Sequence, residues 1–323
     1  MLDFLLEILQ CPACGGALSW GIDERSANRI HQGRATCIEC GAVYPVRDDI
    51  ALFLTTDLPI EDYWQQADDR LTTMLSQYEG LLDQLHASTN PADQFYWGLV
   101  LQEQGRFREA EMVMRQAERG LYTPSYLDGV ERQLRYVVER AIGPVVDLAS
   151  GRGVLVERLL RAKVQPVVAT DFSPRVLRQN RRRFEVLGLY DQLSLVVCDS
   201  RKTPFKNGSV PTLTSHVGLS NVQGEAVAEW RRISAGRLLA THFFFPPDDE
   251  ANRHAARELD MESMLFEDTT RQSFAAVGWA MEVANAYPAF ASPTPKSDLL
   301  GAGIDGLPVT DTELTWCVLT TNA

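Results

Sequence analysis

The sequence predicts an α/β fold, and three apolar segments that each end on an aspartate support this prediction. Val145 and Val146 precede Asp147, residues 167–170 precede Asp171, and residues 193–198 precede Asp199. Such β-branched runs are typical of buried strands, and the first leads through a glycine turn into a helical pattern. Acids that merely end strands are the alternative, but three in succession favour one ligand site.

The turn after Asp147 reads Leu-Ala-Ser-Gly-Arg-Gly over residues 148–153. Gly151 and Gly153 lack a Cβ, so the backbone there can adopt conformations closed to other residues and a ligand can lie against it. A dinucleotide-binding turn would place a third glycine at position 156, where this chain has Val156. Asp147 would repel a pyrophosphate but attract an ammonium or sulfonium charge. The turn therefore favours a cationic ligand.

This motif resembles the first motif of the class I S-adenosylmethionine-dependent methyltransferases, an acid and an apolar residue before a Gly-x-Gly-x-Gly-like turn. Ala149 replaces the usual first glycine. The resemblance implies a Rossmann-like sheet with an antiparallel final strand, and S-adenosylmethionine as cofactor. It also implies that Asp171 binds the ribose hydroxyls, that Phe172 lies beside the adenine and that Asp199 accepts from the adenine amino group. The predicted cofactor-binding residues are Asp147, Ala149, Gly151, Gly153, Asp171, Phe172, Asp199 and Ser200.

Later elements follow the family less closely. The fourth strand, residues 210–217, contains Pro211, which only the first residue of a strand or an edge strand tolerates. A helix is predicted over 225–233, a fifth strand over 236–245, and a closing antiparallel hairpin over 280–289 and 315–320. His216 and His242 lie near the carboxyl ends of strands four and five, where open α/β sheets bind ligands. Both are candidate catalytic bases, although a lone histidine is usually structural.

The N-terminal part of the chain contains two Cys-x-x-Cys-Gly turns. Each turn aims two thiolates at one point, so the pair can complete a tetrahedral zinc site. Disulfides and redox-active thiols fit less well, because nothing indicates secretion and a redox motif needs only one pair. Because all four positions are filled, we expect structural zinc, whose loss unfolds the module. The predicted ligands are Cys11, Cys14, Cys37 and Cys40.

Residues 5–12 and 40–50, around these cysteines, resemble the small zinc-ribbon proteins that act as activator subunits of tRNA and release-factor methyltransferases. The resemblance covers roughly residues 1 to 55. It implies that ribbon and methyltransferase are fused here, so that an activator's task is performed in cis.

The segment between these two parts is helical in character. Apolar residues recur at helical spacing from Leu71 to Leu85 and from Phe107 to Ala117, and a last helix is predicted over 126–141. Many small-molecule methyltransferases have a helical cap in this place. The pairs Tyr63-Trp64 and Tyr96-Trp97 are candidates to line its pocket, with core packing as the alternative. The predicted domains are a zinc ribbon (1–56), a helical cap (57–140) and a class I methyltransferase domain (141–323).

The charge bears on the substrate. The net charge is −12, divided as −3 over residues 1–56, −7 over 57–143 and −2 over 144–323. No segment is basic, which disfavours a nucleic-acid partner. One basic cluster follows Asp171, and we expect it to be a solvated helix face; its members are Arg175, Arg178, Arg181, Arg182 and Arg183.

The sequence therefore predicts a cytoplasmic S-adenosylmethionine-dependent methyltransferase acting on a small molecule. No apolar stretch reaches the length of a membrane span, and the start lacks the basic residues of a signal peptide. Three alternatives stay open: a methyltransferase of the translation apparatus acting on tRNA, rRNA or protein, a non-catalytic scaffold with a degenerate methyltransferase fold, and a nicotinamide-dependent enzyme. The sequence does not predict the oligomeric state.

Overall fold

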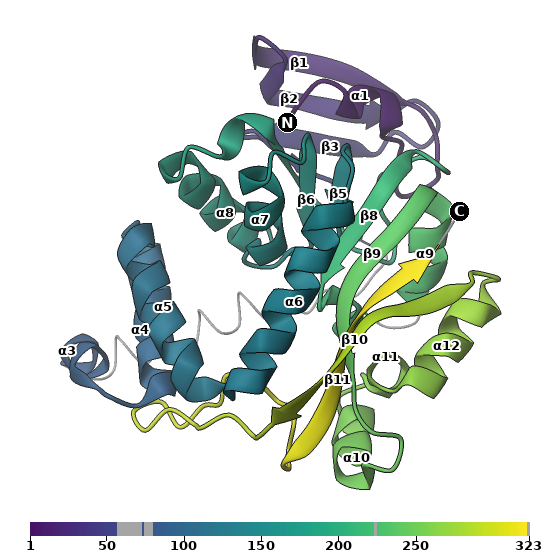
Figure 1. Ribbon diagram of the computed structural model, residues 1–323. Coiled ribbons are helices and arrows are strands. Elements are labelled where there is room, and N and C mark those ends of the chain that lie inside the picture. The colour runs from purple at the N-terminus through teal and green to yellow at the C-terminus, as the bar shows by residue number, and fades with distance from the viewer. Residues whose placement is uncertain (57–72, 74–79, 223–224, 322–323) are drawn as a thin grey trace.

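The computed structural model describes residues 1–56, 73, 80–222 and 225–321. Within them the strands form one 11-stranded sheet in the order β1-β2-β3-β4-β7-β6-β5-β8-β9-β11-β10, with helices on both faces (Figure 1). The strands of its central and final part are β5 (Val145–Asp147), β6 (Val167–Asp171), β7 (Leu193–Val197), β8 (Val210–His216), β9 (Ser234–Phe244), β10 (Met281–Ala291) and β11 (Thr312–Thr321).

Strands β5 to β9 are parallel to one another, whereas β11 pairs antiparallel with both β9 and β10. This confirms the predicted α/β fold and its antiparallel final strands. The chain runs outward from β5 through β6 to β7, then returns to the other side of β5 as β8. The order therefore reverses between β5 and β8, and ligands of open α/β sheets bind at the carboxyl ends of strands at such a point.

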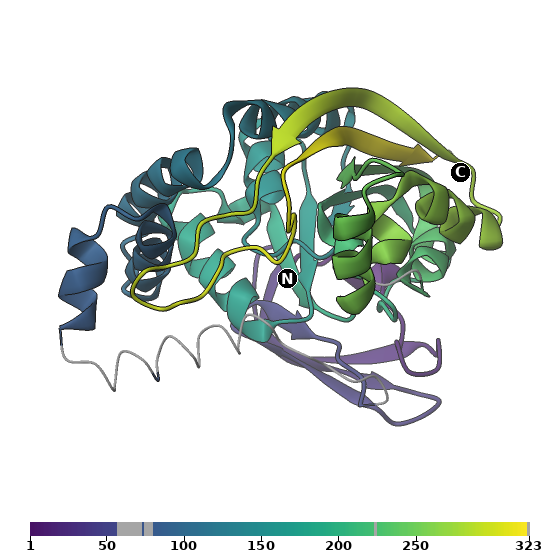
Figure 2. The ribbon, with the colours of Figure 1, turned by 90° about the horizontal axis from the view of Figure 1, so that it is seen from below.

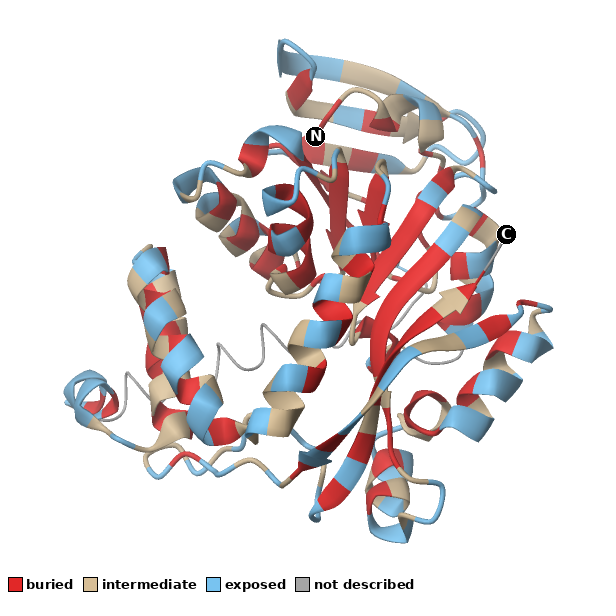
Figure 3. Cartoon of the chain, in the orientation of Figure 1, coloured by how far each residue is buried: buried red, intermediate tan, exposed pale blue. Residues whose placement is uncertain are grey.

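Successive strand residues enter two different cores. Val145 and Val167 pack in one core with helices α6, α7 and α8, while Val146 and Val168 pack in the other with α9 and α12. Burial of both faces explains why these strands are continuously apolar, and Figure 3 shows them as largely buried. The helices are α6 (Pro124–Arg140), α7 (Val154–Arg161), α8 (Pro174–Val186), α9 (Glu225–Ile233), α10 (Glu250–Glu258), α11 (Glu262–Leu265) and α12 (Glu267–Ala276), with short 3-10 turns at Tyr190–Gln192 and Gly218–Ser220.

Pro211 occupies neither of the two places where a strand was expected to tolerate proline. It is the second residue of β8, and β8 lies in the interior of the sheet, between β5 and β9. Pro211 is tolerated because it is exposed and lies where the register shifts, between the pairs Val210–Ser234 and Thr212–Arg237. Pro211 itself is not among the paired residues of β8 and β9, so its missing N–H is not needed in that ladder.

The N-terminal module shares the sheet of the rest of the chain. Its elements are α1 (Leu5–Ile8), β1 (Leu18–Ser26), β2 (Arg29–Cys37), β3 (Val43–Arg47) and β4 (Ile50–Leu52). Strand β4 pairs in parallel with β7, with Ile50 opposite Leu195. Nη2 of Arg29 donates to the carbonyl oxygens of Tyr190, Asp191 and Leu193 at 3.0–3.1 Å. Main-chain pairing and this guanidinium therefore join the module to the central sheet.

Helices α3 (Leu81–Ala87), α4 (Pro91–Glu103) and α5 (Phe107–Leu121) lie in the segment that was predicted to form a cap, and we call these three helices the cap. Asn90 begins α4, since its Oδ1 accepts from the N–H of Ala92 at 2.8 Å. The predicted pair Tyr63-Trp64 and the pattern from Leu71 to Tyr78 lie outside the described residues, apart from Thr73. No helix among residues 80–222 and 225–321, nor α1, is long and apolar enough to cross a membrane.

The loop that connects β10 to β11, residues 292–311, belongs to the cap as well. It runs from the far side of the sheet to α4 and α5 (Figure 2). The carboxylate of the buried Asp93 accepts from the Ser297 hydroxyl, and the Tyr96 hydroxyl donates to the Gly303 carbonyl at 3.1 Å. Leu299 packs on the helical core. The cap is therefore assembled from two parts of the chain whose contacting residues lie more than 200 positions apart.

Candidate functional site

The turn after β5 is held in a left-handed conformation. The φ angles of Ala149, Gly151 and Gly153 are +51°, +50° and +71°. A Cβ on Gly153 would lie 3.1 Å from the Phe184 ring, so that position needs glycine on two grounds. Ala149 adopts the same conformation with a Cβ, at a cost of about 1–2 kcal/mol for an L-residue. Position 149 therefore holds a left-handed conformation although its residue is not glycine.

Asp147, the last residue of β5, is a buried carboxylate with one oxygen left over. Its Oδ1 accepts from the Thr214 hydroxyl at 2.7 Å, and its Oδ2 has no hydrogen-bond partner in the described part of the chain. Burial raises the pKa of this carboxyl to about 6, and the nearby Asp171 adds to the effect. A buried, unpartnered carboxylate oxygen is costly unless a ligand supplies a donor or a positive charge.

Asp171 connects the end of β6 to the same turn. Its Oδ2 accepts from the N–H of Gly151 at 2.9 Å and its Oδ1 from the N–H of Ser173 at 3.0 Å. Phe172, next to it, is half-buried. The structure therefore brings Asp147, Asp171 and the turn residues into one place at the carboxyl ends of β5 and β6.

Asp199 and Ser200 follow β7 nearby. The N–H of Cys198 donates to the Asp171 carbonyl at 3.0 Å, which places this segment beside the end of β6. The Asp199 carboxylate pairs with the Arg201 guanidinium at 2.7 Å, and the Ser200 carbonyl accepts from Nε1 of Trp230 at 3.2 Å. Asp199 therefore carries an internal cation partner that the sequence did not predict.

The two candidate histidines lie on opposite faces of the sheet. Nδ1 of His216 lies 2.7 Å from the Thr241 hydroxyl, and burial together with the charge of Arg152 lowers the pKa of His216 to about 4. His242 is fully buried, and its Nε2 lies 2.5 Å from the Met264 carbonyl. Its neighbour in sequence, Thr241, faces His216, so His242 points into the other core. The structure places only His216 beside Arg152 of the turn.

Three groups of side-chain contacts lie near these strand ends, and we call their residues the edge ring. Nη2 of Arg152 reaches Glu118 at 3.8 Å, one helical turn before Tyr122. The rings of Tyr122, Tyr126, Trp316 and Phe243 contact one after another with centroids 4.8, 5.1 and 5.2 Å apart, and the Thr241 hydroxyl lies 2.7 Å from Nδ1 of His216. The edge ring consists of Arg152, Glu118, Tyr122, Tyr126, Trp316, Phe243, Thr241 and His216.

Most members of the edge ring are surrounded by protein yet reached by solvent. Tyr122, Tyr126 and His216 are half-buried, but burial is the main cause of the shifted pKa of each, upward for the tyrosines and downward for the histidine. Sequence reasoning missed the tyrosines, Phe243 and Trp316, because their only signal was an aromatic residue on a predicted strand or helix.

The basic cluster on α8 is not a solvated face, so that prediction was wrong for three of its five members. Arg175 pairs with Glu103 of the cap at 2.7 Å, Arg181 lies 3.6 Å from Asp49 of the N-terminal module, and Arg183 pairs with Glu157 of α7. These arginines bind neighbouring elements together. The positive charges of these three arginines are therefore paired with carboxylates of the same chain.

The four predicted metal ligands converge on one point. The sulfur atoms of Cys11, Cys14, Cys37 and Cys40 all lie within 4.8 Å of one another, with Cys11–Cys40 at 3.7 Å and Cys14–Cys37 at 3.5 Å. Four thiolates at the usual Zn–S distance of about 2.3 Å would be about 3.8 Å apart in a tetrahedron. Gly15 and Gly41 close the two turns with φ of +76° and +73°. The donor set and its spacing fit structural zinc.

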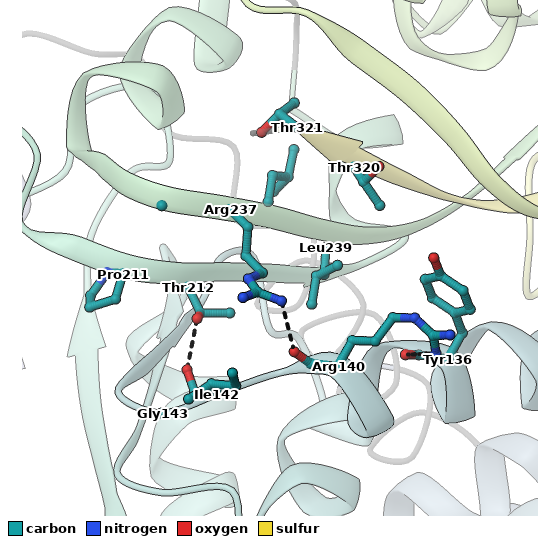
Figure 4. Close-up of a pocket in the computed structure, with 12 residues that line it drawn as sticks. Tyr136, Arg140, Ile142, Gly143, Pro211, Thr212, Arg237, Leu239, Thr320 and Thr321 are labelled. Atoms are coloured by element: carbon teal, nitrogen blue, oxygen red, sulfur yellow. Dashed lines mark hydrogen bonds between the residues drawn. The ribbon is translucent and has the colours of Figure 1, made fainter. Parts of the chain in front are cut away.

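A cavity of about 580 Å³ lies at the amino ends of β8 and β9, at the opposite end of the strands from the glycine turn (Figure 4). Pro211 and Thr212 line it from the amino end of β8, and Arg237 lines it from the start of β9. Its polar groups largely bond to each other: Arg237 donates to the Arg140 carbonyl at 3.3 Å and Thr212 to the Ile142 carbonyl at 2.7 Å. None of the predicted site residues lines this cavity.

Two family models match separate parts of the chain. Residues 145–235 match the model of a methyltransferase domain, and residues 3–49 match the model of Trm112p-like proteins. These matches confirm both resemblances seen in the sequence, at the glycine turn and at the cysteine turns. No curated protein sequence matches the chain.

Several solved structures are similar at low identity. They include the YcgJ protein from Bacillus subtilis, with a TM-score of 0.48 and 17% identity over 59% of this chain and 98% of that one. The MccD protein has a TM-score of 0.46 and 12% identity over 61% and 98% of the two chains. Geranyl diphosphate C-methyltransferase from Streptomyces coelicolor A3(2), in complex with Mg²⁺, geranyl diphosphate and S-adenosyl-L-homocysteine, has a TM-score of 0.45 and 14% identity over 59% and 77%.

Proposed function

We propose that this chain, which carries a methyltransferase domain behind a Trm112p-like domain, transfers the methyl group of S-adenosylmethionine to a small-molecule acceptor. The observation that supports this most is the unpartnered Oδ2 of Asp147, buried beside a left-handed glycine turn. S-adenosylmethionine carries an ammonium and a sulfonium charge, and either would compensate the carboxylate that burial otherwise penalises.

The other predicted residues fit the remaining parts of this cofactor. The carboxylate of Asp171 accepts from the N–H groups of Gly151 and Ser173 at the end of β6, and a carboxylate is an acceptor that suits ribose hydroxyls. Half-buried Phe172 offers an apolar surface for the adenine. Asp199 and Ser200 lie beside Asp171, where they would meet the adenine edge, with Arg201 sharing the Asp199 carboxylate.

The chemistry asks little of the protein side chains. Bound S-adenosylmethionine supplies an electrophilic methyl group with a neutral thioether as leaving group, so positioning of the acceptor can provide much of the rate. An acceptor that loses a proton also needs a base. His216 is the candidate, because its lowered pKa keeps it neutral at pH 7 and its Nδ1 is oriented by the Thr241 hydroxyl.

A small acceptor fits this surface better than a nucleic acid. Arg175, Arg181 and Arg183 pair with acids of the chain, and the net charge is −12. Phosphate recognition needs clustered cations that are available to the ligand. The edge ring instead offers aromatic surface, the imidazole of His216 and one arginine, Arg152, whose charge is already paired with the Glu118 carboxylate.

Calorimetric titration tests the proposal. We expect the protein to bind S-adenosylmethionine and S-adenosylhomocysteine, and not to bind NADH. Methyl-labelled S-adenosylmethionine incubated with separated small-molecule, RNA and protein fractions should label the small-molecule fraction. Absence of S-adenosylmethionine binding would remove the proposal, and labelling confined to RNA or protein would transfer it to a macromolecular substrate.

A further inference from the structure

The cavity at the amino ends of β8 and β9 is separate from the glycine turn, which lies at the other end of the same strands (Figure 4). Its volume of about 580 Å³ falls within the range of sites that bind small molecules. The end of α6, the start of β9 and the end of β11 contribute side chains to its lining. The cavity therefore has the size of a ligand site and takes no part in the proposed cofactor site.

The charged residues of its described lining are two arginines, Arg140 and Arg237, and no acid accompanies them there. Glu139 precedes Arg140 on α6 and pairs with it at 3.3 Å, but both side chains are exposed, so solvent weakens this ion pair. Arg237 pairs with no carboxylate in the described part of the chain. Its charge is therefore available to an anion, in a chain whose net charge is −12.

Contacts within the lining orient both guanidinium groups. Nη1 of Arg237 donates to the Arg140 carbonyl at 3.3 Å, which uses one of the five N–H donors of this guanidinium. The Arg140 guanidinium lies over the Tyr136 ring, with its central carbon 3.7 Å from the ring centre. Figure 4 shows the Arg237 side chain reaching from β9 toward the end of α6, while that of Arg140 extends toward Tyr136. A guanidinium held in this way can meet two oxygens of one anion.

The rest of the lining combines apolar surface with hydroxyl groups. Leu239 and Tyr136 supply apolar surface, and Thr320 and Thr321 line the cavity from the end of β11. The Thr321 hydroxyl is buried and has no hydrogen-bond partner among the residues that the structure describes. Buried hydroxyls are usually paired, so this part of the lining has hydrogen-bonding capacity that the described chain does not use.

We infer that this cavity binds a small organic anion, which is a carboxylate or phosphate group attached to an apolar body. The anionic group would accept from the remaining N–H groups of Arg237, Arg140 would add positive charge, and the apolar body would lie against Leu239 and Tyr136. The inference does not rest on the proposed methyltransferase function, because the cavity and the glycine turn lie at opposite ends of the strands. It assigns a binding site and no reaction.

Binding of three benzene derivatives to the full chain tests the inference. Phenyl phosphate is largely a dianion near neutral pH, benzoate is a monoanion and benzyl alcohol is neutral. We expect calorimetry at constant ionic strength to show phenyl phosphate binding at least about tenfold more tightly than benzyl alcohol, with benzoate between them, because charge-assisted hydrogen bonds are the stronger ones. Benzoate binding more tightly than phenyl phosphate would support the inference with a carboxylate as the anionic group. Equal binding of all three compounds, or of none, would overturn it.

Three variants locate the site. Arg237→Gln should weaken phenyl phosphate binding by about tenfold, because it removes the unpaired charge while keeping a donor for the Arg140 carbonyl. Arg237→Lys should retain part of the affinity, because it keeps the charge and loses only the paired donors. Arg231→Gln on α9 is the matched control, since Arg231 is exposed and is not among the lining residues.

All three variants should unfold at the temperature of the parent and bind S-adenosylhomocysteine as the parent does. Parent-like phenyl phosphate binding by Arg237→Gln, or an equal loss in Arg231→Gln, contradicts the inference alone. Failure of the parent to bind S-adenosylhomocysteine contradicts the proposed function and leaves the expected anion binding unchanged.

Discussion

The Thr214 hydroxyl donates to Oδ1 of Asp147 over 2.7 Å, and this single bond joins two neighbouring parallel strands at the point where the order of the sheet reverses. It fixes the orientation of the carboxylate, so that Oδ2 is buried without a partner among the described residues. Thr214 on β8 thus holds one oxygen of the Asp147 carboxylate and leaves the other available to a ligand. Four predictions follow from this arrangement and from those around it.

Replacement of Asp147 by asparagine should weaken S-adenosylmethionine binding by about tenfold or more, because the amide keeps the bond from Thr214 but offers no negative charge. Calorimetry measures the affinity directly. Asp128→Asn is the matched control, since Asp128 is exposed on α6 and should bind as the parent does. Parent-like affinity of Asp147→Asn would show that the cofactor does not use this carboxylate.

The same substitution should change the pH dependence of stability. The pKa of Asp147 is about 6 in the folded protein against an ordinary value of 3.8, so the folded state binds more protons between these values. Stability from this group therefore falls as pH rises from about 4 to about 6, by up to about 3 kcal/mol at 1.36 kcal/mol per pKa unit. Urea unfolding of the ligand-free protein should show Asp147→Asn gaining on the parent across this window. A constant difference from pH 4 to pH 7 would contradict the assignment.

Ala149→Gly should leave the protein as stable as the parent or up to about 1 kcal/mol more stable. Glycine removes the left-handed strain of about 1–2 kcal/mol at φ +51°, but costs about 0.5–1 kcal/mol in unfolded-state entropy. Thermal unfolding measures the change, and S-adenosylmethionine affinity should be retained. Ala149→Val serves as the opposite test: it should destabilise clearly, since β-branched residues resist this conformation. A destabilised glycine variant would mean that the alanine methyl is needed for packing.

Zinc removal should unfold the N-terminal module and lower the stability of the central sheet with it. Structural zinc typically contributes about 10–16 kcal/mol to such units, and β4 of the module pairs with β7. We expect one zinc per chain by metal analysis, and a fall in melting temperature on chelation that added Zn²⁺ reverses. Cys14→Ser should behave as the chelated protein does. Full stability after complete metal loss would show that the four cysteines hold the module without a metal.

Local pattern was sufficient to predict the parts that depend on neighbouring residues. The helix at 225–233 was predicted with the bounds that it has, and the two cysteine turns were placed at one metal site, because propensity and motif spacing are local. The way in which β8 accommodates Pro211 was not predictable, since it depends on a register shift against β9. The arginines of α8 were misread because their partners come from the module, the cap and α7.

The edge ring illustrates the limit of sequence reasoning most clearly. Tyr122 and Trp316 belong to one series of contacts but are separated by almost two hundred residues, and nothing local marks either as more than a core aromatic. His216 and His242 both lie near the end of a strand, so both had the same signal in the sequence. In the structure Thr241 and His242 alternate along β9, so Thr241 faces His216 while His242 lies on the other face of the sheet. The predicted roles of the cofactor residues and of His216 remain predictions.

The pairing of β4 with β7 has a consequence for the life of the chain in the cell. A chain produced without residues 1–56 would expose β7 as an edge strand with unpaired N–H and C=O groups. Exposed edge strands of this kind can pair with other chains and aggregate. In one polypeptide β4 is made in equal amount to β7 and is synthesised before it, so the strand that pairs with this edge is already present when β7 forms.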